Sequence, residues 1–178
     1  MTGPADPVGV PLSSPDDEGG TGPDAILRNN IGYDMKRAFN AIQADVNATL
    51  QPFGLRMLTY SVLAVIRDNN GLRQSRLAEI LLIERPNLVL ILDELEGLDL
   101  VTRTRAPDDR RAYELTVTLK GRRLCDRAFR AVAEHDNRMA RGLGAEERAA
   151  LHKALRLIES NGRSPDDSRD TRREIPRP

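Results

Sequence analysis

Apolar residues recur at three- and four-residue steps along most of this chain, which is the spacing of one face of an α-helix. Residues at the segment ends fit helix termini: Asp24 can cap a helix, Pro86 suits a first turn, and Thr118 can cap another helix. The pattern predicts six helices, over about residues 24–50, 57–69, 74–82, 86–99, 118–141 and 144–160. The inward-facing stripes of the first, fifth and last helices are predicted to include Met35, Phe39, Ile42, Cys125, Phe129, Val132, Leu151, Leu155 and Ile158.

Two short segments alternate between apolar and polar residues instead. Residues 101–105 and 113–117 have the two-residue period of a strand, and the polar loop between them makes the pair a hairpin. Short helices followed by a hairpin predict a mainly α fold with a small β-hairpin wing, a winged helix-turn-helix. The long flanking helices extend beyond so small a domain, so their apolar stripes are expected to pack against a second copy of the chain.

The two ends of the chain differ in composition from the middle. Residues 1–23 contain five prolines and few large apolar side chains, and residues 162–178 are similar, so both predict disordered tails. Between them we expect an N-terminal dimerisation helix (24–56), a DNA-binding lobe (57–118) and C-terminal dimerisation helices (119–161).

Charge is unevenly distributed, although basic and acidic residues both number 27. The first 24 residues have five acids and no Lys or Arg, a local charge of −5, whereas residues 101–123 have a net charge of +4. The neutral total argues against a nucleic-acid partner, but the basic excess lies on the predicted wing and its flanks. This distribution favours contact between the hairpin and DNA.

Several classes of protein are not expected. No apolar stretch is long enough to span a membrane, and there is no secretory signal pattern. The single cysteine suits a reducing cytoplasm, and with only His135 and His152 it forms no metal-ligand cluster. Both histidines are interpreted as helix-surface or dimer-contact residues. No catalytic motif or cofactor loop is recognisable, so neither an enzyme nor a cofactor is predicted.

An ordered set of motifs resembles the MarR family of bacterial transcriptional regulators. These segments are Leu-Arg-Gln-Ser-Arg-Leu-Ala-Glu (72–79), Ile-Glu-Arg-Pro-Asn-Leu (83–88), Leu-Asp-Glu-Leu-Glu (92–96) and Leu-Val-Thr-Arg (100–103). The most specific part is Pro-Asp-Asp-Arg-Arg-Ala (107–112) followed by Val-Thr-Leu-Lys-Gly (117–121), which is similar to the family's wing signature. The resemblance implies a homodimer that binds a palindromic operator, usually as a repressor. It also implies a small aromatic acid or related effector bound between the dimerisation helices and the DNA-binding lobe.

Candidate DNA contacts follow from this arrangement. The start of the third helix can hold a phosphate, the start of the fourth can reach base edges, and an arginine at the hairpin tip can enter the minor groove. Arg110 is assigned to the minor groove, with Arg111 braced by Asp109. The remaining candidates are Gln74, Ser75 and Arg76 for phosphate, and Arg85, Asn87 and Leu90 for bases.

Three features depart from the family pattern. Residues 84–99 carry five acids against Arg85 alone, which places major-groove reading in doubt and gives more weight to the wing. Asp99 stands where the family usually has a helix-ending glycine, and Arg73 stands where a Ser or Thr cap is expected.

The effector is the least determined feature of the sequence. An aromatic wall or carboxylate clamp can be built from Tyr33, Arg37, Tyr60 and Arg67, although packing and surface roles are equally compatible with them. The Glu-Arg-Pro-Asn-Leu-Val stretch (84–89) resembles relatives that regulate aromatic-compound catabolism, some of which respond to acyl-CoA thioesters.

Three alternatives to a ligand-responsive repressor stay open. Val89 and Leu90 could form a docking patch for another protein, with the wing unused. Cys125 could sense oxidants, although a buried structural role suits its apolar stripe better. The cleft between the helices could also serve a small-molecule enzyme.

Overall fold

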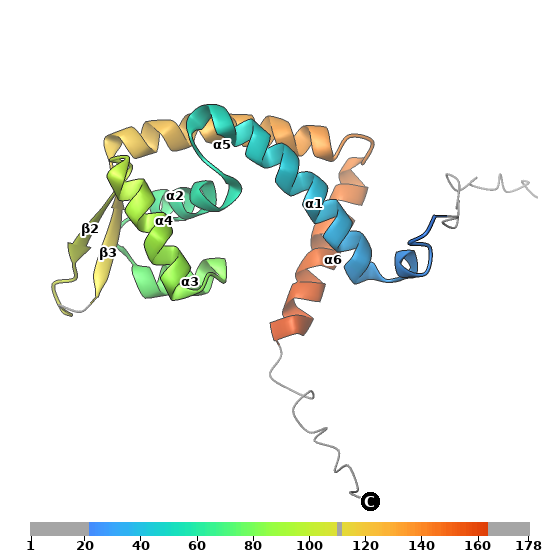
Figure 1. Ribbon diagram of the computed structural model, residues 1–178, viewed down its shortest axis with the longest axis horizontal. Coiled ribbons are helices and arrows are strands. Elements are labelled where there is room, and N and C mark those ends of the chain that lie inside the picture. The colour runs from blue at the N-terminus through green and yellow to red at the C-terminus, as the bar shows by residue number, and fades with distance from the viewer. Residues whose placement is uncertain (1–21, 110–111, 164–178) are drawn as a thin grey trace, which may run out of the picture. The chain divides into compact units, whose positions relative to one another are not determined.

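The computed structural model describes residues 22–109 and 112–163 (Figure 1). It divides within its first long helix, between Asp45 and Val46, into two compact units. The described helices are the 3₁₀ turns η1 (Leu27–Asn29) and η2 (Gln51–Phe53), and α1 (Ile31–Leu50), α2 (Met57–Asp68), α3 (Gln74–Leu81), α4 (Arg85–Gly97), α5 (Leu119–Met139) and α6 (Ala145–Arg163). The strands are β1 (Leu72–Arg73), β2 (Val101–Arg105) and β3 (Tyr113–Val117).

The predicted order of helices, hairpin and helices is confirmed, with both hairpin strands at their predicted bounds. The alternating pattern did not predict β1. This strand pairs with β3 and gives the antiparallel order β1-β3-β2. A two-residue strand contains a single period of alternation and no repeat, so no local pattern could indicate it. The predicted tails fall outside the described residues except at 22–23 and 162–163, where α6 continues to Arg163.

The predicted start of the first helix at Asp24 is wrong. The α-helix begins at Ile31, after η1, because Asn30 has an extended backbone with φ −107° and ψ 115°. The carbonyl of Asn30 then accepts the first helical hydrogen bonds, from the N–H groups of Tyr33 and Asp34. The carboxylate of Asp24 binds side chains farther along the chain instead of capping a helix.

A core of leucine, isoleucine and valine holds the larger unit together. Helix α2 contributes one side of it, α4 and the base of the hairpin contribute another, and α5 packs on α2. Burying these side chains is the main source of stability for such a small domain. The large side chains with less than 2% exposure are Leu50, Leu63, Ile66, Leu77, Leu88, Leu92, Leu95, Leu115, Val62 and Val101.

The predicted Thr118 cap and the end of α4 meet at the junction between the hairpin and its flanking helices. The hydroxyl of Thr118 accepts a hydrogen bond from the Gly121 N–H at 2.9 Å and so caps α5. The same hydroxyl donates to the Asp99 carbonyl at 2.8 Å. Asp99 itself has φ +56°, the left-handed conformation that ends α4 where the family usually has glycine. These contacts fix where the hairpin leaves the helical core.

The predicted inward stripe of the last helix is not buried within the chain. All three of its apolar residues, Leu151, Leu155 and Ile158, are exposed, and Phe129 on α5 is 57% exposed. The surface role predicted for His135 is also wrong, because its side chain is buried at 4% exposure, whereas His152 is exposed as predicted. Among the described residues, no helix is long and apolar enough to cross a membrane.

Candidate nucleic-acid interface

The beginnings of α3 and α4 and the hairpin together line one groove of about 470 Å³. Helix α3 begins directly after β1, and α4 begins after Leu82, whose left-handed backbone (φ +52°) turns the chain between the two helices. The groove therefore exposes two helix N-termini, whose free N–H groups attract anions. Its lining residues are Arg73, Gln74, Ser75, Arg85, Leu88, Val89, Arg103, Asp109, Ala112 and Tyr113.

The groove contains some, but not all, of the predicted DNA contacts. Gln74 and Ser75 lie on its α3 side, and Arg85 lies at the start of α4. Two other candidates on α4, Asn87 and Leu90, are exposed beside it, with Leu90 at 68%. Arg76 is also exposed and pairs with Glu79 at 2.8 Å.

The wing tip is only partly described. Arg110 and Arg111 lie outside the described residues, and with them the brace predicted between Arg111 and Asp109. Asp109 itself lines the groove. Its neighbour Asp108 forms an ion pair with Arg73, at the N-cap of α3. Arg73 does not cap the helix with its side chain, so the departure from Ser or Thr places an arginine between α3 and the wing.

The acids of α4 that departed from the family pattern are used within the fold. Arg103 on β2 contacts Asp93 at 2.6 Å and Glu96 at 2.5 Å, with its side chain only 21% exposed. These two carboxylates raise the pKa of the Arg103 guanidinium, Glu96 most strongly through its hydrogen bond. Glu94 pairs with Arg56 at 2.8 Å. Three of the five acids, Asp93, Glu94 and Glu96, therefore hold the hairpin and the start of α2 against α4.

Three basic side chains of the wing and its flank are engaged within the fold. Arg103 is neutralised by α4, and Lys120 donates to the Leu98 carbonyl at 2.7 Å. Arg105 lies over the ring of Tyr113 at 5.8 Å. Of these three contacts only the ion pairs of Arg103 offset a positive charge, whereas those of Lys120 and Arg105 restrict where their side chains can reach.

Six groove residues are not among the predicted DNA contacts: Arg73, Leu88, Val89, Arg103, Ala112 and Tyr113. For Arg103 and Tyr113, which lie on the two hairpin strands, the sequence did contain a signal for their position. Alternation puts Val101, Arg103 and Arg105 on one face, and the antiparallel register sets Arg105 opposite Tyr113 on that face. For Arg73 the signal was its unusual residue type at a cap position.

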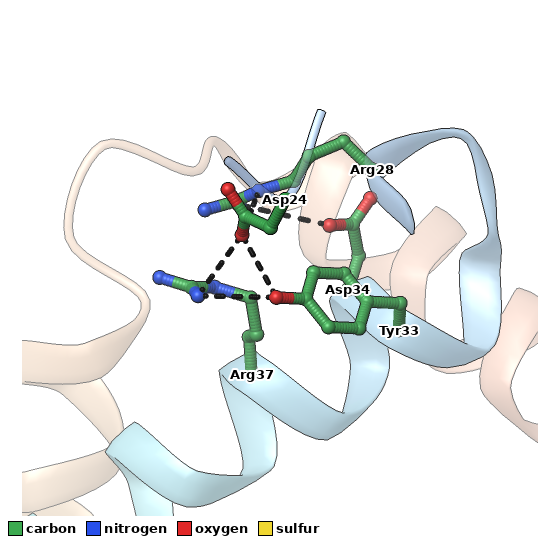
Figure 2. A network of polar contacts seen from close by, with 5 residues as sticks. All are labelled: Asp24, Arg28, Tyr33, Asp34 and Arg37. Atoms are coloured by element: carbon green, nitrogen blue, oxygen red, sulfur yellow. Dashed lines mark hydrogen bonds and ion pairs between the residues drawn. The ribbon is translucent and has the colours of Figure 1, made fainter. Parts of the chain in front are cut away.

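The predicted effector residues fall into two separate pairs, one in each compact unit. Tyr33 and Arg37 contact each other near the start of α1, where the Tyr33 hydroxyl donates to Asp24 at 2.8 Å (Figure 2). In the other unit, Arg67 on α2 pairs with Asp126 on α5 at 2.9 Å. Tyr33 and Arg37 therefore belong to one unit, and Tyr60 and Arg67 belong to the other.

Cys125 lies beside the second pair. Its side chain has no exposure, and burial raises the pKa of its thiol, an effect that nearby Arg67 opposes. Burial also raises the pKa of the Tyr60 hydroxyl. A buried thiol with a raised pKa is a poor oxidant sensor, which favours the structural interpretation of Cys125.

A helix-turn-helix followed by an antiparallel hairpin, with two helix N-termini and the hairpin on one groove, defines a winged helix-turn-helix DNA-binding protein. The comparisons agree: the MarR family model matches residues 55–113. A transcriptional regulatory protein assigned to the hcr operon of Thauera aromatica is 30% identical, over 81% of this chain and 88% of its own length. The chain belongs to the MarR family of DNA-binding transcriptional regulators, which are not enzymes.

Two solved structures add detail. The transcriptional repressor CouR, bound to a 23-mer DNA duplex, is 39% identical with a TM-score of 0.73, covering 76% of this chain and 96% of that one. CouR from Rhodococcus jostii RHA1, bound to p-coumaroyl-CoA, is 27% identical with a TM-score of 0.69, covering 80% and 98%.

Proposed function

We propose that this regulator is a homodimeric repressor that binds a palindromic operator in the cytoplasm. A small aromatic acid or its CoA thioester releases it from the DNA. The observation that carries the proposal is the single groove that gathers Gln74, Ser75 and Arg85 between two helix N-termini and the wing. A protein that binds a DNA duplex needs, on one face, hydrogen-bond donors for the phosphates and side chains that reach the base edges. This groove offers both.

Each part of the groove has a proposed role. Ser75 and the N–H groups at the start of α3 bind a phosphate, with Gln74 and Arg76 beside them. Arg85 and Asn87 read guanine and adenine edges in the major groove, while Leu90 contacts a thymine methyl group. Arg110 enters the minor groove beside the hairpin, and Arg111 with Asp109 holds the turn.

Dimerisation is proposed because the apolar stripe of α6 stays exposed among the described residues. None of its residues from 145 to 162 is buried, although an apolar stripe runs along it. An amphipathic helix gains its stability from packing that stripe, so an uncovered one calls for a partner surface. A second copy of the chain supplies an equivalent stripe, and a symmetric dimer matches a palindromic operator.

The effector class follows from the relatives. One CouR structure contains p-coumaroyl-CoA, which is an aromatic acid thioester. The residues proposed to receive the effector are Tyr33, Arg37, Tyr60 and Arg67, because arginines bind carboxylates and phosphates and tyrosines pack against aromatic rings.

Fluorescence anisotropy with labelled DNA from upstream of the gene tests the proposal. Binding should weaken steeply as salt rises, because phosphate contacts release counterions. The double variant Arg110→Ala/Arg111→Ala should bind all sequences more weakly and lower the salt slope by about 1–2. Lys153→Ala/Arg156→Ala is the charge-matched control, since both residues lie on α6 away from its apolar stripe.

Two results would contradict the proposal. Salt-independent binding would favour the protein-docking alternative through Val89 and Leu90. Equal DNA affinities of the two double variants would show that the wing does not contact DNA. Addition of p-coumarate or p-coumaroyl-CoA to the complex tests effector release, and turnover of either compound would favour an enzyme.

A further inference from the structure

One carboxylate oxygen at the beginning of the described chain receives three hydrogen bonds. Asp24 Oδ2 accepts from the Tyr33 hydroxyl at 2.8 Å, from Arg28 Nε at 3.1 Å and from Arg37 at 3.2 Å (Figure 2). The Arg37 guanidinium also donates to the Tyr33 hydroxyl at 3.4 Å. Three donors from η1 and two turns of α1 therefore converge on a single anionic atom.

The groups around Asp24 Oδ2 stabilise a negative charge. The guanidinium groups of Arg28 and Arg37 lie 5.9 Å and 5.8 Å from the centre of the Tyr33 ring. Asp34 is the other acid in the cluster, 3.8 Å from Arg28. The hydrogen bond from Tyr33 lowers the pKa of the Asp24 carboxyl, and the two arginines add to this effect. The cluster thus stabilises a carboxylate in its charged form.

Asp24 lies outside the α-helix that carries two of its three donors. Asp24 lies in the turn before η1, and η1 contains no buried residue that would anchor this turn. The side chains remain accessible, with Asp24 at 27% and Arg37 at 51% exposure. By contrast, Tyr33 and Arg37 are fixed one turn apart on α1. If the Asp24 side chain leaves, the Tyr33 and Arg37 donors therefore keep their positions on α1 for an incoming anion.

We propose that Arg28, Tyr33 and Arg37 form a binding site for a carboxylate or phosphate group, and that Asp24 is its built-in competitor. A ligand anion takes the three hydrogen bonds of Asp24 Oδ2, and the Asp24 side chain rotates away while its backbone stays bonded to η1. The inference rests on the proposed effector response for the identity of the ligand. Beyond the proposed function, the inference states that Asp24 sets the ligand concentration at which the regulator responds.

The test compares Asp24→Asn with Asp34→Asn in the full chain. Both variants lose one negative charge from the same cluster, but only Asp24 binds Tyr33 and Arg37. Isothermal titration with p-coumarate probes a carboxylate, and titration with coenzyme A probes phosphate groups. Asp24→Asn should bind at least one probe about fivefold more tightly than the wild type, and Asp34→Asn should stay within about twofold of it.

A second experiment follows the Asp24 carboxyl group directly by NMR spectroscopy. Carboxyl ¹³C NMR of the wild-type protein should show a lowered Asp24 pKa without ligand, returning towards its ordinary value when the tighter probe saturates the site. A purely structural turn contact predicts altered signals for residues 22–30 in Asp24→Asn with unchanged affinity for both probes, and that result would overturn the inference. Equal gains in Asp24→Asn and Asp34→Asn would also overturn it, as would no binding of either probe to Asp24→Asn.

Operator affinity is measured on the same samples without any probe. Loss of DNA binding by the wild type would contradict the proposed function. Normal operator binding and effector release, with no effect of Asp24→Asn on probe affinity, would contradict this inference alone.

Discussion

Gly121 on α5 packs directly against the backbone carbonyl of Leu100. A Cβ at position 121 would lie 2.1 Å from the Leu100 oxygen and 2.9 Å from Val117 Cγ2. That carbonyl is held in place because it accepts a hydrogen bond from the Thr118 N–H at 3.0 Å. The glycine of the Val-Thr-Leu-Lys-Gly segment thus allows α5 to approach the base of the hairpin.

Replacing this glycine should destabilise the domain. Gly121→Ala is expected to lower the free energy of unfolding by about 1–3 kcal/mol, the usual cost of overpacking, measured by urea denaturation. Gly97→Ala is the control, because a Cβ at Gly97, at the end of α4, would meet no atom within 4 Å, and its φ is not positive. It should be neutral or stabilising by up to about 1 kcal/mol. Equal losses in both variants would contradict the close-packing argument.

The pair between Arg103 and Glu96 should contribute measurably to stability. A double-mutant cycle with Arg103→Met and Glu96→Gln is expected to give a coupling energy of about 1 kcal/mol, because the Arg103 side chain is largely shielded and the Glu96 side chain is partly exposed. Added salt should reduce it. The exposed pair of Arg76 and Glu79 is the comparison, with an expected coupling of about 0.3–0.5 kcal/mol. Equal couplings would mean that the hairpin is not braced by α4.

The apolar stripe of α6 should control the oligomeric state. Leu155→Asp is expected to give a monomer by light scattering, because a charge would be buried in the proposed interface. Ala149→Asp adds the same charge to an exposed position on the opposite side of α6 and should stay dimeric. A dimeric Leu155→Asp protein would place the interface elsewhere.

The Cys125 thiol should be inert in the native protein. Because burial raises its pKa, the reaction with a disulfide reagent at pH 8 should be at least about tenfold slower than in the urea-unfolded chain. Rapid reaction of the native protein would revive the oxidant-sensing alternative.

Stability should respond to alkaline pH in a related way. The unfolded chain ionises its thiol first, so the Cys125 contribution is constant below its ordinary pKa of about 8.5 and is lost as pH rises towards the native value. Urea denaturation across this range should show the decline. Cys125→Ala should remove that part of the slope and leave the part due to Tyr60, whose pKa is also raised by burial.

Much of the fold was predictable because its signals are local. The six helices follow from apolar spacing, and the hairpin bounds follow from alternation and a polar loop. Thr118 was predictable as a cap from its hydroxyl, and Asp99 as the end of α4 because it stands where the family usually has glycine. The start of the first helix was not predictable, because Asp24 binds Tyr33 and Arg37 instead of the nearest backbone.

The candidate interface was predictable only in outline. Sequence position identified Gln74, Ser75 and Arg85, since they stand at helix starts. It could not show that Arg103 is neutralised by Asp93 and Glu96, because these residues belong to different elements. Counting charges along the chain therefore overstated the positive charge available to DNA.

The sequence by itself determined which segments are helical, where the hairpin turns and which family the wing signature resembles, because periodicity, caps and motifs are properties of neighbouring residues. The tertiary structure alone decided which charges are paired, that His135 and Cys125 are buried, and that a carboxylate of the chain fills the cluster at Tyr33. Those outcomes depend on contacts between residues distant in sequence, whose distances no local pattern encodes.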